Sequence, residues 1–214
     1  MKYKEIREVV YEVVLKAQAA GLIRLSAGNI STRTEDGLVA ITPSGIRYDM
    51  LRAEDIAIVD LDGRTVDATR RPSSELPMHL AILRELPEVG AICHTHSPYA
   101  ISFAILGAEI PVVNLELLTC GGPLPVAPWA CPGTPEAGQV TVEVFRLRPG
   151  LKICLLRDHG LVAIGMNVEN AFEMAYDAEV GMQTYYQALQ IGQPEPLTPD
   201  QIDQIHQVYR YVPS

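Results

Sequence analysis

Hydrophobic residues recur every three or four positions near the start of the chain. Within residues 3–20, Ile6, Val9 and Val13 fall on one side of a helix, and Gly21 ends the pattern. The same kind of spacing predicts further helices over 73–87, 97–107, 167–192 and 198–211, and a short helix that starts near Pro135. Asn167 is the expected N-cap of the longest of these helices.

Shorter apolar runs bounded by turn residues predict strands. The clearest example is residues 56–66, which indicate a hairpin with Asp62 and Gly63 at its tip. Further strands are expected within 26–45, at 89–96, and in 152–165 on both sides of a tight break at 158–160.

Two segments give a less regular pattern. Residues 110–118 indicate a strand, or a strand that leads directly into a helix. Residues 121–140 are rich in proline and glycine, but they alternate apolar positions and contain Trp129, which favours a packed, irregular wall.

Helical and strand patterns alternate along the whole chain, without an internal repeat or a linker. We therefore expect a single α/β domain over residues 1–214, with a central, mostly antiparallel sheet flanked by helices on both faces. A chain of 214 residues is long enough to bury a substantial hydrophobic core.

The net charge of −9 argues against nucleic acid or an anionic membrane as a partner, because binding their phosphates requires a basic surface. No apolar run reaches the roughly 20 residues that a membrane helix needs, and the charged N-terminus lacks the features of a secretory signal. We expect a cytoplasmic protein with free thiols, two of which, Cys93 and Cys154, lie in apolar runs.

Two of the five histidines, His94 and His96, close an apolar strand two residues apart. Alternate strand residues share a face, so both imidazoles can bind one cation. This pair alone is equally consistent with two polar residues at a strand end. A third histidine, His159, sits at the break between two further strands, which favours a shared ion, whereas His79 and His206 lie on predicted helices and are interpreted as non-ligands.

Glu75 and the serines before it mark the start of the predicted helix 73–87. A carboxylate here often only complements the helix dipole. However, Ser73, Ser74 and the amides of a helix N-terminus also suit a phosphate group, and Glu75 is then close enough to reach a neighbouring cation.

The ordered motifs GNIS, ITPSG, PSSE, HTH and DHG resemble the class II aldolase/adducin family from Leu25 to about Leu189. The resemblance is strongest to the branch that cleaves fuculose 1-phosphate. It implies a lyase that uses one divalent metal, usually zinc, and forms a homotetramer with active sites between subunits. Zn²⁺ is the expected ion, although three histidines and Glu75 also suit Mn²⁺, Co²⁺ or Fe²⁺.

Site residues carried over from this resemblance fall into two groups. The implied metal ligands are Glu75, His94, His96 and His159. The implied phosphate-binding residues are Gly28, Asn29, Ser44, Gly45, Ser73 and Ser74.

The implied reaction splits a ketose 1-phosphate similar to fuculose 1-phosphate into dihydroxyacetone phosphate and an aldehyde. A divalent metal bound by the substrate's carbonyl and hydroxyl oxygens stabilises the resulting enediolate. Glu75 is expected to leave the metal when substrate binds and then to transfer a proton.

One position departs from the family pattern. Leu115 stands where the fuculose-phosphate branch has a proton-donating tyrosine, and the next residue is Glu116. If Glu116 is the acid, the enzyme could also be an epimerase, a dehydratase or a decarboxylase. If Glu116 only forms a salt bridge, Tyr209 or Tyr211 is the remaining candidate for the proton donor. A non-enzymatic, adducin-like module is a further alternative, which the three histidines oppose.

Overall fold

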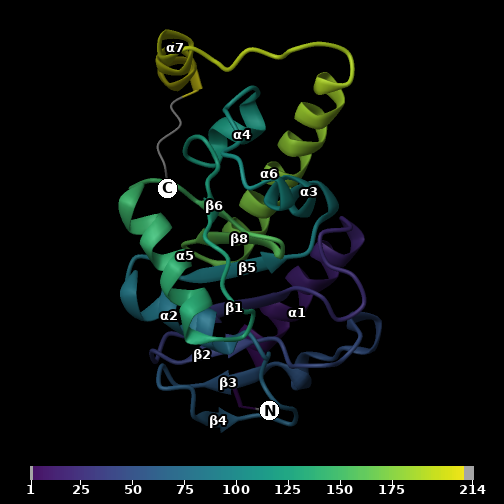
Figure 1. Ribbon diagram of the computed structural model, residues 1–214. Helices are drawn as coiled ribbons and strands as arrows, with labels where there is room; N and C mark the ends of the chain where they lie inside the picture. Colours follow the sequence, from purple (N-terminus) through teal and green to yellow (C-terminus); the bar gives the residue numbers. More distant parts are fainter. Residues whose placement is uncertain (1, 210–214) are drawn as a thin grey trace.

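The computed structural model describes residues 2–209 and contains one eight-stranded sheet with the order β4-β3-β2-β1-β5-β8-β7-β6 (Figure 1). The strands are β1 (Asn29–Arg33), β2 (Val39–Ile41), β3 (Ala57–Val59), β4 (Thr65–Asp67), β5 (Ala91–Thr95), β6 (Val126–Ala127), β7 (Ile153–Leu156) and β8 (Gly160–Gly165). All neighbouring pairs are antiparallel except β6 and β7, which are parallel.

Helices cover both faces of this sheet. They are α1 (Lys4–Ala19), α2 (Leu76–Glu85), α3 (Pro98–Leu106), α4 (Leu115–Thr119), α5 (Pro135–Leu147), α6 (Val168–Leu189) and α7 (Pro199–Tyr209), with short 3₁₀ turns at Tyr48–Met50 and Ala53–Asp55. On one face α6 packs against β5, β8, α1, α3 and α4, while α2 and α5 pack side by side on the other (Figure 1).

The central strands are apolar because helices cover both faces of the sheet there. Every residue of β5, β7 and β8 is buried, because both sheet faces exclude water there. The free thiols of Cys93 and Cys154 lie in this core, where burial raises the pKa of each to about 12. The expected α/β fold with a mostly antiparallel sheet is confirmed.

The two irregular segments differ in part from expectation. Residues 110–118 do lead into a helix, α4, whose N-cap Asn114 accepts a hydrogen bond from the Leu117 amide. Residues 121–140 include the short edge strand β6, and the Trp129 side chain is 63% exposed. The prediction that Trp129 packs inside this wall is therefore wrong, because it follows the last strand of the sheet and has no further strand beyond it.

No helix within residues 2–209 is both long enough and apolar enough to span a lipid bilayer. Tyr211, one of the expected proton donors, lies outside the described residues.

Candidate metal centre

His94 and His96 come from the end of β5, at the middle of the sheet. His94 is fully buried and pairs across strands with Asn29 of β1. His96 follows directly after the strand, and its Nε2 lies 3.1 Å from the His94 Nε2. The expectation that the two imidazoles share one face of the strand is confirmed.

The turn between β7 and β8 brings His159 to the same place. Asp158 takes a left-handed conformation with φ of 58°, which reverses the chain. Gly160 lies so close to β5 that an added Cβ would be 2.4 Å from the Thr95 carbonyl oxygen and 3.2 Å from the His94 ring. The absent side chain therefore allows the His159 ring to approach within 4.8 Å of the His94 ring, centroid to centroid.

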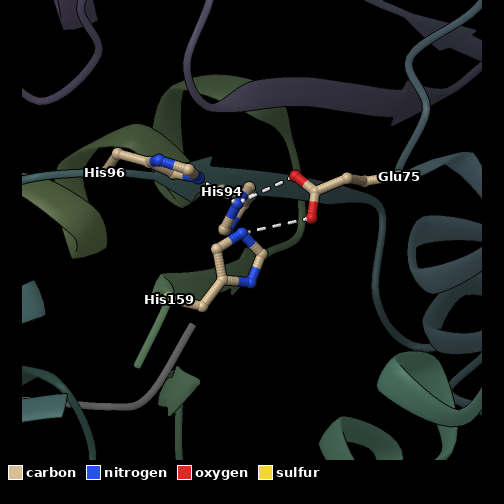
Figure 2. Close-up of side chains that lie close together, drawn as sticks. All are labelled: Glu75, His94, His96 and His159. Carbon is tan, nitrogen blue, oxygen red and sulfur yellow. Dashed lines mark hydrogen bonds and ion pairs between the residues drawn. The ribbon is translucent and has the colours of Figure 1, made fainter. Parts of the chain in front are cut away.

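Glu75 reaches the three rings from the start of α2, on the neighbouring connection. The Ser73 hydroxyl accepts a hydrogen bond from the Glu75 amide and orders this turn. Glu75 Oε2 lies 3.0 Å from His94 Nε2, and Oε1 lies 3.3 Å from His159 Nε2. The four side chains turn toward one another (Figure 2), and one possible ligand atom from each lies within 4.8 Å of all the others.

The protonation states of these four side chains are those needed to bind a cation. His94 Nδ1 donates to the Leu161 carbonyl oxygen, which leaves Nε2 directed at the cluster. Burial first, and then the neighbouring imidazole of His94, lowers the pKa of His96 and of His159 to about 4, so both are neutral at pH 7. Burial acts to raise the pKa of Glu75, but His94 and the Asn29 amide outweigh it and hold the pKa well below its usual range.

Three imidazole nitrogens and one carboxylate form a donor set that binds zinc and related divalent ions. These four residues are the ones that the sequence predicts as ligands, and among residues 2–209 they form the group that could hold a metal ion. The donor chemistry therefore fits a divalent cation.

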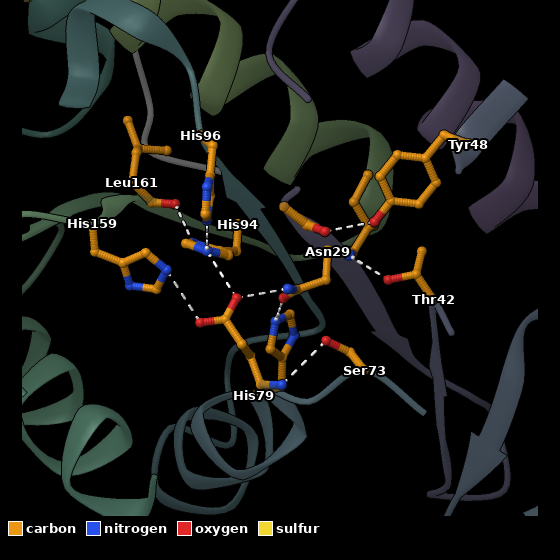
Figure 3. A network of polar contacts seen from close by, with 12 residues as sticks. Asn29, Thr42, Tyr48, Ser73, His79, His94, His96, His159 and Leu161 are labelled. Carbon is orange, nitrogen blue, oxygen red and sulfur yellow. Dashed lines mark hydrogen bonds and ion pairs between the residues drawn. The ribbon is translucent and has the colours of Figure 1, made fainter. Parts of the chain in front are cut away.

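Two further polar residues, Asn29 and His79, support the cluster through contacts that the sequence did not predict. Asn29 Nδ2 donates to Glu75 Oε2 over 2.7 Å, and the Asn29 oxygen contacts Nε2 of the buried His79 (Figure 3). His79 lies outside the four-residue group. The spacing of four residues between Glu75 and His79 could have indicated that the two side chains lie close together, because residues four apart share a helix face.

Residues expected to bind phosphate lie in adjoining segments. Gly28 has φ of 84°, and an added Cβ would be 2.8 Å from the His94 carbonyl oxygen, so this turn lies directly against β5. The segment around Ser44 lies beside Pro72 and Ser73, since Pro43 forms a bridge with Pro72. Ser44, Gly45 and Ser74 are exposed, whereas Asn29 and Ser73 are buried.

The amides in these segments are less free than the sequence suggests. The Ser44 amide donates to the Arg71 carbonyl oxygen and the Ser73 amide donates to that of Thr42. These two amides are therefore not available for phosphate, because both hold the neighbouring chain segments together.

Glu116 does not join the four-residue group of its own chain. It is half-buried on α4, beside Asp177 of α6, whose pKa is raised by burial first and then by the charges of Glu116 and Glu173. The role of Glu116 as the acid therefore stays a prediction. The other expected donor that the structure describes, Tyr209, is 61% exposed on α7.

A three-histidine, one-carboxylate centre at the middle of a covered α/β sheet defines a class of divalent-metal enzymes. Residues 8–186 match the family described as "Class II Aldolase and Adducin N-terminal domain". The chain belongs to the class II aldolase/adducin family, and its relatives identify it as an aldolase within that family.

Three comparisons carry this assignment. The chain is 37% identical to a 5-deoxy-D-ribulose 1-phosphate aldolase of Bacillus thuringiensis serovar kurstaki, covering 96% of this chain and 95% of that protein. It is 32% identical to the L-fuculose phosphate aldolase of Escherichia coli K12, covering 94% and 92%. A solved structure of an L-fuculose 1-phosphate aldolase superimposes with a TM-score of 0.90 at 28% identity, covering 99% of each chain.

Proposed function

We propose that this protein is a metal-dependent aldolase that cleaves a ketose 1-phosphate into dihydroxyacetone phosphate and an aldehyde. The observation that carries the proposal is the convergence of Glu75, His94, His96 and His159 on one point. Zn²⁺ is the proposed ion, because tetrahedral sites of nitrogen and oxygen ligands are typical of zinc. A bound divalent ion would supply Lewis-acid polarisation of the substrate's carbonyl oxygen.

The protein side chains then move two protons. Cleavage of the C3–C4 bond removes a proton from the C4 hydroxyl and adds one to C3. Glu75 is the proposed group for transfer at C3, because its carboxylate lies at the metal centre and is 8% exposed. A second group must take the C4 hydroxyl proton as a base, and the same group is the acid that donates this proton in the reverse, condensing direction.

Glu116 is the proposed second group, with Tyr209 and Tyr211 as the alternatives. Since Glu116 lies beside Asp177 and outside the four-residue group of its own chain, it would act at the centre of a neighbouring subunit. This requires an oligomer, for which a homotetramer with active sites between subunits is proposed. Light scattering should then give about four times the 23.4 kDa of one chain, and a monomer would contradict the arrangement.

The phosphate group is proposed to bind beside the metal centre. Its proposed partners are Gly28, Asn29, Ser44, Gly45, Ser73 and Ser74. Support comes from the pairing of the segments at Pro43 and Pro72 and from the exposure of Ser44, Gly45 and Ser74. No lysine is needed, because hydroxyl and backbone donors alone can hold a phosphate.

The relatives narrow the choice of sugar. One is named for 5-deoxyribulose 1-phosphate, one for both 5-methylthioribulose 1-phosphate and 5-deoxyribulose 1-phosphate, and others for fuculose phosphate. We propose a ketose 1-phosphate of this group, similar to fuculose 1-phosphate, as the substrate.

A panel of these three sugar phosphates tests the proposal. The zinc-loaded protein is incubated with each, and released dihydroxyacetone phosphate is measured by its enzymatic reduction. At least one sugar should release one equivalent of it together with an aldehyde. Consumption of sugar without dihydroxyacetone phosphate would instead indicate epimerase, dehydratase or decarboxylase chemistry, and no consumption of any sugar would contradict the proposed substrate class.

A further inference from the structure

Beneath the metal centre, four side chains form one continuous line of hydrogen bonds from Ser31 to Glu75. Ser31 Oγ lies 2.6 Å from His79 Nδ1, His79 Nε2 contacts Asn29 Oδ1, and Asn29 Nδ2 donates to Glu75 Oε2 over 2.7 Å. All four residues are buried, and Ser31 and His79 are completely so. A buried polar group without a partner is costly, so each member depends on its neighbours.

The direction of every bond in this line follows from the carboxylate at its end. An ionised carboxylate only accepts hydrogen bonds, so the Asn29 amide must present its NH₂ group to Glu75. The Asn29 oxygen then faces His79, and because it also only accepts, His79 Nε2 must carry a proton. In a neutral imidazole Nδ1 is the acceptor, and the Ser31 hydroxyl donates to it.

The Asn29 amide could also adopt the flipped orientation, which would weaken the hold on Glu75. A half-turn of its terminal torsion exchanges oxygen and nitrogen with little change in shape. The amide oxygen would then face Glu75 Oε2, which also lies 3.0 Å from His94 Nε2, and the two acceptors would repel. The Glu75 carboxylate would lose the donor that holds it toward the histidines.

We propose that His79 is a positioning residue, whose Nε2–H fixes the orientation of the Asn29 amide and thereby holds the Glu75 carboxylate toward the metal centre. This inference rests on the proposed metal-dependent function. Loss of a hydrogen-bonding partner behind a metal ligand typically lowers metal affinity about 10–100-fold.

Two conservative variants separate positioning from packing. His79→Gln places an amide donor near the position of Nε2 and retains the bond to Asn29. His79→Asn places its amide near Nδ1, so it retains the bond to Ser31 but leaves Asn29 without its donor. Both remove the imidazole and both keep a polar group in the core, so a purely structural role predicts similar losses.

Cobalt binding is the readout, because its visible absorption reports ligand geometry without any substrate. Chelator-treated wild-type and variant proteins are titrated with Co²⁺, and thermal unfolding is measured alongside. We expect His79→Asn to bind Co²⁺ about 10–100-fold more weakly than wild type, and His79→Gln within a few-fold of it. Equal losses in both variants, or no loss in either, would overturn the inference.

A second measurement needs no variant and applies even if His79→Asn does not fold. Long-range ¹⁵N–¹H spectra of the wild-type protein should show His79 as the neutral tautomer with its proton on Nε2. A proton on Nδ1 instead would overturn the inference. Neither experiment involves a sugar phosphate, so a protein that gives the expected Co²⁺ pattern but cleaves no ketose phosphate would refute the proposed function alone.

Discussion

His79, His96 and His159 all have pKa values below that of a free histidine side chain. Burial is the largest cause in each, followed by the neighbouring imidazole of His94, and the values fall to about 3 for His79 and about 4 for the other two. Only a neutral imidazole binds a cation. Burial therefore keeps His96 and His159 in the ligand form throughout the neutral pH range.

The same burial predicts acid sensitivity of the metal-free protein. Above about pH 6.5, His79 is neutral whether the chain is folded or unfolded. As the pH falls further, the unfolded chain takes up a proton that the folded protein refuses until about pH 3. His79 should therefore remove up to about 1.4 kcal/mol from the free energy of unfolding per pH unit below 6.5.

Urea unfolding of the chelator-treated protein at pH 7 and pH 5 measures this loss. His79→Gln has no imidazole at this position, so its free energy of unfolding should fall less steeply than that of wild type over the same interval. An equal slope in the variant would show that His79 does not contribute to the acid sensitivity.

At the scale of elements, the β7–β8 turn places His159 only because Gly160 leaves room beside β5. The Cβ of Gly160→Ala would be 2.4 Å from the Thr95 carbonyl oxygen, so the two strands would have to separate. Overpacking of this kind costs about 1–3 kcal/mol. We expect a lower melting temperature and weaker zinc binding, measured by calorimetry.

Gly192→Ala is the matched control for this substitution. Gly192 has no atom within 4 Å of an added Cβ, so alanine should be tolerated there with unchanged zinc binding. A Gly160→Ala protein that behaved like Gly192→Ala would show that close packing at the turn does not determine the position of His159.

Helix α4 carries the proposed second proton-transfer group, Glu116. Groups of this type contribute about 10²–10⁴-fold to a rate, so Glu116→Gln should lower kcat by that factor with little change in KM or zinc content. Glu75→Gln should lower zinc content as well, because it removes a ligand. Normal turnover of Glu116→Gln would direct attention to Tyr209 and Tyr211, to be tested by truncation before α7.

At the scale of the whole molecule, the sequence is informative where short-range patterns determine structure. The apolar run of β5 and the break at 158–160 identify strands whose ends must carry His94, His96 and His159, and the fold confirms that these side chains meet. The line from Ser31 through His79 to Asn29 could not be predicted in this way. It depends on which strand lies beside α2, and only the tertiary fold determines that.

Glu116 and Trp129 are two residues whose surroundings could not be predicted from the local sequence. An apolar run around Glu116 indicates burial, but the run folds into a short helix whose polar side meets Asp177 of α6. Trp129 is large and apolar, yet it follows the edge strand β6 and stays exposed. Local composition cannot reveal which neighbouring element, or which neighbouring subunit, a side chain faces.

The central claim is that one divalent ion, held by Glu75 and three histidines, makes this chain an aldolase. Restoring zinc stepwise to chelator-treated protein, while measuring dihydroxyacetone phosphate released from a ketose 1-phosphate, tests it most directly. The rate should rise from near zero in proportion to added zinc and become constant at one ion per chain. Full release from the metal-free protein, or a rise in rate that persists in His159→Ala, would contradict the claim.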